Sequence, residues 1–122
     1  MIDHLELSVT DVERSTEFYR RALAPLAYSV HATGTPRGFG TAPDRLDFWL
    51  RAGEASTPRP HFAFHCSTRR EVVEAHRAAL EAGGADNGAP AVLARIHPTY
   101  FAAFVRDPDG HNVEFACHAP PA

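Results

Sequence analysis

Two stretches of the chain alternate apolar and polar side chains, and each leads into a segment with helical spacing. Residues 4–9 and 61–66 both show a period of two with one apolar face. Such alternation is typical of a β-strand that is buried on one side only. The apolar positions are Leu5, Leu7, Val9, Phe62, Phe64 and Cys66, and the opposite face holds His4, Glu6, Ser8, His61, Ala63 and His65.

The segments that follow predict helices near residues 11–23 and 69–82. Thr10 with Glu13, and Thr68 with Glu71, match the capping box, in which a hydroxyl and a carboxylate bind free backbone N–H groups where a helix begins. Apolar residues then recur at helical spacing in both segments. The glycine pair at 83–84 is expected to end the second helix.

The chain also repeats itself. A shift of 57 residues places the first strand and helix on the second pair, and a shift of 65 residues places residues 43–50 on 108–115. Four more segments have the character of strands: 28–33, 39–42, 91–96 and 100–105. The sequence therefore predicts one α+β domain over residues 1–122, made of two β–α–β–β–β modules at about 1–52 and 60–118.

Composition and charge exclude several classes of partner and location. The net charge is −3 and there is no basic run, which argues against nucleic acid as a partner. No apolar run approaches the ~20 residues that span a bilayer, and the N-terminus lacks the pattern of a secretory signal, so the expected location is the cytoplasm. Cys66 and Cys117 lie in apolar stretches, and each is predicted to be a small buried hydrophobic residue.

The cationic and imidazole residues narrow the chemistry further. All twelve cationic residues are arginine, which excludes a Schiff-base lysine and a phosphate-loop lysine. There are eight histidines, and histidine is the commonest metal ligand. Four of them are predicted to be solvated surface residues: His31, His76, His111 and His118.

Three sequence features resemble the vicinal oxygen chelate superfamily. They are the opening Ile2-Asp3-His4, the mid-chain segment 60–64 and the closing segment 107–114, set in the duplicated module. That superfamily contains glyoxalase I, bleomycin-resistance proteins, extradiol dioxygenases and fosfomycin-resistance enzymes. The resemblance covers nearly the whole chain. It implies an eight-stranded cup with the helices outside, and a divalent metal held by His4, His61 and Glu114.

The strand pattern selects the same three residues. On each of their strands one face is apolar and suits contact with a helix, whereas the other face is polar or small. A polar face opposite the helices is expected to line a solvent-accessible concavity. Two imidazoles and a carboxylate in such a place suit Fe, Mn, Ni or Zn with open coordination positions.

The resemblance also has departures. Under the 65-residue shift Trp49 takes the place that corresponds to Glu114, and Trp cannot bind a metal; glyoxalase I has a carboxylate there. Asp47 is on the same face but roughly 6.6 Å away along the strand. The extradiol dioxygenase signature would begin at His97 and end at Glu114, but Phe104 stands where that family has a tyrosine. Tyr100, four residues earlier on the same strand face, is a candidate replacement.

These features leave three functional hypotheses. The first is a metal-dependent lyase, isomerase or ring-cleaving dioxygenase acting on a small molecule with vicinal oxygens. In it Glu114, Glu6 or His65 moves a proton, and His97 is either a further acid or base or a turn residue. The second is a metal-free protein that sequesters a drug between aromatic side chains, and the third is a regulatory or structural role.

The expected substrate-binding residues are Trp49, Phe104 and Asp47. Because each module leaves an unpaired strand edge, a homodimer is expected.

Overall fold

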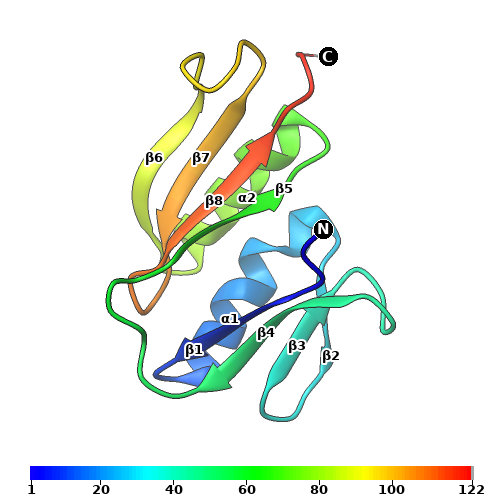
Figure 1. Ribbon diagram of the computed structural model, residues 1–122, viewed down its shortest axis with the longest axis vertical. Helices are drawn as coiled ribbons and strands as arrows, with labels where there is room; N and C mark the ends of the chain where they lie inside the picture. Colours follow the sequence, from blue (N-terminus) through cyan, green and yellow to red (C-terminus); the bar gives the residue numbers. More distant parts are fainter. Residues whose placement is uncertain (122) are drawn as a thin grey trace.

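Eight strands are divided between two four-stranded sheets, and each sheet is covered on one face by a helix (Figure 1). This computed structural model describes residues 1–121. The first sheet has the order β1 (Leu5–Val9), β4 (Leu46–Ala52), β3 (Arg37–Gly40) and β2 (Ser29–Ala32). The second has the order β5 (His61–His65), β8 (Asn112–Cys117), β7 (Phe101–Arg106) and β6 (Ala85–Val92).

The two sheets have the same topology. In each, the first and last strands of the module pair in parallel, and the remaining neighbours are antiparallel. The element order is strand, helix and three strands, twice over, with a short 3-10 helix η1 (Ala24–Leu26) in the first half. The predicted α+β class with duplicated β–α–β–β–β modules is therefore confirmed.

The first helix, α1 (Val12–Ala22), begins differently from the prediction. Its N-cap is Asp11, whose carboxylate accepts a hydrogen bond from the Arg14 N–H at 3.1 Å. Thr10 bonds instead to the carboxylate of Asp109, through its backbone N–H and its hydroxyl. The predicted Thr10–Glu13 capping box is therefore wrong, because a residue from the other half of the chain takes the Thr10 hydroxyl.

The second helix, α2 (Arg69–Glu81), begins as its sequence predicts. The Thr68 hydroxyl accepts from the Glu71 N–H at 3.1 Å, and the Glu71 carboxylate accepts from the N–H of Ser67 at 3.0 Å. The helix ends before Gly83, which has a φ of +99°. That left-handed conformation favours glycine because it has no Cβ.

Strand β6 lies earlier in the chain than predicted. It spans Ala85–Val92 rather than 91–96. Its sequence contains Asn87, Gly88 and Pro90, which are typical of turns. The strand forms nonetheless because it is the outer strand of its sheet, where proline is tolerated and register shifts occur.

Apolar side chains from both sheets meet in one core. Phe48 of β4 packs against Phe62 and Phe64 of β5, with ring centroids 5.9 and 5.1 Å apart, and against Tyr19 of α1 at 4.8 Å. Cys66 and Cys117 are fully buried in this core, as predicted. Burial raises the pKa of the Cys66 thiol to about 12, so this side chain stays an uncharged hydrophobic residue at neutral pH.

A buried polar cluster ties α1 to the turn between β7 and β8. The Asp107 carboxylate accepts hydrogen bonds from the Tyr19 hydroxyl at 2.5 Å and from His111 Nδ1 at 2.8 Å. His111 is 0% exposed, and His76, which is 7% exposed, pairs with Asp86 at 3.0 Å. The prediction that His76 and His111 are solvated is therefore wrong, because each has a carboxylate partner that permits its burial.

Candidate functional site

Glu114 lies at the centre of the outward face of the second sheet. It is in β8, where Val113 and Phe115 point into the core and Glu114 points to the opposite face. Its side chain is only 6% exposed. One carboxylate oxygen contacts His61 Nε2 at 2.9 Å, and the other accepts a hydrogen bond from the Tyr100 hydroxyl.

His61 reaches Glu114 because of the parallel pairing of β5 with β8. The register places His61 beside Asn112 and Ala63 beside Glu114. His61 Nδ1 lies 2.9 Å from the carbonyl oxygen of Asn112. A carbonyl only accepts hydrogen bonds, so Nδ1 carries the proton, and Nε2 is the nitrogen directed at the carboxylate.

Tyr100 supplies a hydroxyl that Phe104 lacks. Phe104 lies opposite Glu114 in the β7–β8 register, with its ring 6.1 Å from that of His61. Burial, followed by the hydrogen bond to Glu114, raises the pKa of Tyr100 to about 12. Tyr100 therefore keeps its proton at neutral pH and acts as a hydrogen-bond donor to the carboxylate.

His97 lies next to Tyr100 and pairs with a second histidine. Its Nδ1 accepts a hydrogen bond from the Thr99 backbone N–H at 3.2 Å, so the ring proton is on Nε2. That nitrogen donates to His118 Nδ1 at 2.9 Å. The ring of His65 is stacked on His118 with centroids 6.4 Å apart. The contact between His118 and His97 was not predicted, because the spacing of the two residues in the sequence gives no sign that their side chains meet.

The other candidate residues lie on the outward face of the first sheet. His4 Nδ1 lies 2.7 Å from the Asp3 carboxylate, and Glu6 lies 3.4 Å from Arg51 in an exposed pair. Asp47 accepts a hydrogen bond from the Tyr28 hydroxyl at 2.9 Å. Burial and this bond raise the pKa of Tyr28 well above its usual value. Trp49 lies between Glu6 of β1 and Gly38 of β3 in the sheet register.

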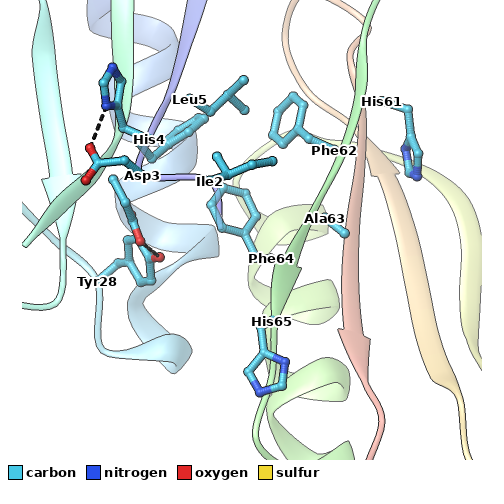
Figure 2. A pocket seen from close by; sticks show the side chains of 12 residues that line it. Ile2, Asp3, His4, Leu5, Tyr28, His61, Phe62, Ala63, Phe64 and His65 are labelled. Carbon is cyan, nitrogen blue, oxygen red and sulfur yellow. Dashed lines mark hydrogen bonds and ion pairs between the residues drawn. The ribbon is translucent and has the colours of Figure 1, made fainter.

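One chain brings His61 and Glu114 together but holds His4 apart from them. A cavity of about 530 Å³ separates the edges of β1 and β5, with Leu5, Phe48, Phe62 and Phe64 in its lining. Figure 2 shows His4 and His61 on opposite sides of this cavity, both pointing away from it. Within residues 1–121 no group of three His, Cys, Asp or Glu side chains converges on a metal position.

Glu6, Asp47 and Trp49 lie in the first sheet, and His4 directly precedes its strand β1. Phe104 lies in the second sheet with Glu114, whereas His97 and Tyr100 lie in the loop that leads into β7. The candidate residues therefore form two half-sites, one on each sheet.

Among the described residues 1–121, no helix is long and apolar enough to cross a membrane.

Solved structures with the same fold are similar over nearly their whole length. A glyoxalase/bleomycin resistance protein from Albidiferax ferrireducens T118 has a TM-score of 0.80 at 20% identity, covering 95% of this chain and 97% of that one. A glyoxalase/bleomycin resistance protein/dioxygenase family enzyme from Burkholderia phytofirmans PsJN has a TM-score of 0.74 at 15% identity, covering 97% and 98%. No curated protein sequence matches the chain.

The sequence comparison agrees with the fold and the duplicated strand pattern. The family described as the Glyoxalase/Bleomycin resistance protein/Dioxygenase superfamily matches residues 1–115, which include both half-sites. The chain therefore belongs to the glyoxalase/bleomycin resistance protein/dioxygenase superfamily.

Proposed function

We propose that the protein is a metal-dependent enzyme acting on a small molecule with vicinal oxygens. His61 and Glu114 of one chain and His4 of a second copy would hold one divalent ion. The observation that carries this proposal is the arrangement of His61: its Nδ1 is held by the Asn112 carbonyl, and its Nε2 lies 2.9 Å from the Glu114 carboxylate.

The donor groups fit a divalent ion. Metal-binding histidines usually donate their other ring N–H to a carbonyl or carboxylate, which fixes the ring and its tautomer. His61 does so to Asn112, and His4 Nδ1 has the Asp3 carboxylate at 2.7 Å. Both imidazoles therefore have Nε2 as the nitrogen available to a metal.

The separation of His61 from Glu114 fits as well. Two ligands about 2.1 Å from one ion and at a right angle to each other lie roughly 3 Å apart. The observed Nε2 to Oε1 distance is 2.9 Å.

A second copy is needed because the two half-sites face away from each other. β1 and β5 are both edge strands of their sheets. Unpaired edges are normally covered, and pairing of two copies at these edges would place the His4 face of one chain next to the Glu114 face of the other. A homodimer would then hold two equivalent sites.

The metal would act as a Lewis acid toward vicinal oxygens of the substrate. Tyr100 donates a hydrogen bond to Glu114 and orients it. Glu6 is the nearest candidate base, because it lies two residues from His4 on the same face and is only weakly held by the exposed Arg51. His65 is four residues along β5 from His61, roughly 13 Å away, and both nitrogens of His97 are already bonded.

The test of this function is metal content after reconstitution. The protein is stripped with a chelator, incubated in turn with Fe(II), Mn(II), Ni(II) or Zn(II), desalted and analysed for metal. One ion per chain is expected for at least one of these metals. Protein that takes up none of them contradicts the proposal and favours the metal-free drug-binding hypothesis.

Mixing two variants that each bind no metal tests whether the metal site is shared between chains. His4→Ala and Glu114→Ala protein are each expected to bind no stoichiometric metal. After they are unfolded and refolded together in equal amounts, about one quarter of the wild-type metal content should return, since half of the dimers are mixed and each mixed dimer has one intact site. Light scattering reports the dimer. A mixture that recovers no metal would show that the chains do not share ligands.

Trp49→Glu should tighten metal binding. Trp49 corresponds to Glu114 in the duplicated pattern and lies on the same outward face as Glu6 and His4. A carboxylate there adds a fourth protein ligand, so the dissociation constant should fall by about tenfold or more. Trp49→Leu is the matched control and should leave the affinity unchanged. Titration calorimetry measures both, and equal affinities for the two variants would contradict the expected position of residue 49.

A further inference from the structure

The indole of Trp49 lies over Gly38 of the neighbouring strand. Gly38 of β3 pairs directly with Trp49 of β4. A Cβ at position 38 would lie 2.8 and 2.9 Å from two carbons of the indole ring. The ring can occupy this place only because residue 38 has no side chain. Trp49 Nε1 also donates to the Leu46 carbonyl oxygen at 3.3 Å, which fixes the ring in its plane.

Trp49 also lines a shallow pocket. This pocket has a volume of about 350 Å³, and its other lining residues are Asp3, His4, Glu6, Pro36 and Leu46. Pro36 and Leu46 supply apolar walls, whereas Asp3 and Glu6 place carboxylates at the rim. The Asp3 side chain is 92% accessible and that of Glu6 is 44% accessible.

From this geometry we infer that Trp49 and Gly38 form a stacking platform for a planar aromatic ring that carries no negative charge. A fixed aromatic face binds flat π-systems by offset stacking, and because the ring is already immobilised little conformational entropy is lost on binding. Asp3 and Glu6 bring two negative charges against the one positive charge of Arg51, so the rim opposes an anionic ligand. The inference names the substrate class for the same face as the proposed function, but it requires neither a metal nor His61.

The single tryptophan of the chain makes this platform directly observable. Metal-free protein in chelator is titrated with 2,3-dihydroxynaphthalene, and the indole N–H resonance is followed by NMR. The matched probes are the fully saturated decalin-2,3-diol and the anion naphthalene-2-carboxylate. The expected result is a saturable shift of the indole signal with the dihydroxynaphthalene, and binding at least tenfold weaker for both other probes.

Two glycine variants test the role of Gly38. Gly38→Ala places a methyl group against the indole and should weaken binding of dihydroxynaphthalene at least tenfold. Gly34→Ala is the matched control, because a Cβ there has nothing within 4 Å, and it should bind as the wild type does. Circular dichroism checks that both fold. Should Gly38→Ala fail to fold, Trp49→Phe and Trp49→Leu, measured by calorimetry, replace it: Phe should keep the preference for the aromatic probe and Leu should lose it.

Three results would overturn the inference: equal binding of the saturated diol, equal binding of the anion, or wild-type affinity in both Gly38→Ala and Trp49→Leu. Because every measurement uses metal-free protein, these results leave the proposed metal site unaffected. Failure of the stripped protein to take up metal would, in turn, not contradict the stacking platform.

Discussion

Replacing Glu114 by alanine is expected to abolish stoichiometric metal binding and to leave the fold intact. The carboxylate contacts His61 Nε2 on one oxygen and Tyr100 on the other, so it is the group around which the half-site is built. Its loss removes one of three ligands, and the affinity should fall by at least about 100-fold. Equilibrium dialysis with the metal that the wild type retains measures the change.

Glu6→Gln is the matched control for this experiment. Glu6 is also an outward-facing carboxylate at a β-strand position, but it lies two residues from His4 and is placed here as a base rather than a ligand. It should keep full metal content.

The Glu114 substitution also leaves the Tyr100 hydroxyl without its partner, which should lower the free energy of unfolding by about 1–3 kcal/mol. Glu114→Ala protein that retains its metal would disprove the ligand set.

Replacing Asp107 by alanine is expected to cause the largest loss of stability. The side chain accepts hydrogen bonds from Tyr19 of α1 and from His111, and the side chains of Asp107 and His111 are both 0% exposed. Removing one partner of a buried pair leaves the other uncompensated, so the free energy of unfolding should fall by about 3–5 kcal/mol. Urea unfolding followed by circular dichroism measures it.

The exposed Asp44 provides the comparison for Asp107. It lies in the corresponding Pro-Asp turn region of the first half of the chain, and its replacement by alanine should change the free energy of unfolding by less than about 0.5 kcal/mol. Equal effects of the two substitutions would show that the buried cluster contributes little to stability.

Acid sensitivity provides a second measure of the Asp107 cluster. Burial alone would raise the pKa of Asp107, but the hydrogen bonds from His111 and Tyr19 outweigh it, and the pKa is lowered. The stability that this carboxylate contributes is therefore present above its unfolded pKa of about 3.9 and is lost as the pH falls through the lower folded value. Asp107→Asn should be less stable than the wild type at pH 6, and the difference should shrink below pH 4. A constant difference from pH 6 to pH 3 would contradict this role.

The alternation of residues 4–9 and 61–66, with the helical stripes that follow, was sufficient to predict the strand–helix units and their duplication. These patterns are local, because side-chain direction in a strand or helix depends only on spacing along the chain. The α2 cap at Thr68 and the end at Gly83 were predictable for the same reason. The outward direction of His61 and Glu114 was also fixed by alternation, and the pairing of β5 with β8 places them in contact.

Features that depend on partners distant in the sequence were not predictable in this way. Thr10 bonds to Asp109, 99 residues away, so the expected α1 cap moved to Asp11. His111 is buried because it pairs with Asp107, which also accepts a hydrogen bond from Tyr19 of α1, although its sequence neighbours suggest a solvated turn. The Asn87–Pro90 stretch forms a strand only because the outer edge of a sheet tolerates it.

Alternation along each strand was sufficient to show which residues face the polar side of each sheet, because successive side chains point to opposite faces. The placement of the two polar faces relative to each other depends on how the modules pack, which no local pattern contains. Packing the apolar faces of both modules into one core turns His4 and His61 away from each other, a consequence of burying Phe48 against Phe62 and Phe64. Cross-strand register decided that the Trp49 ring rests on Gly38, because pairing between strands brings together residues whose separation in the sequence carries no signal.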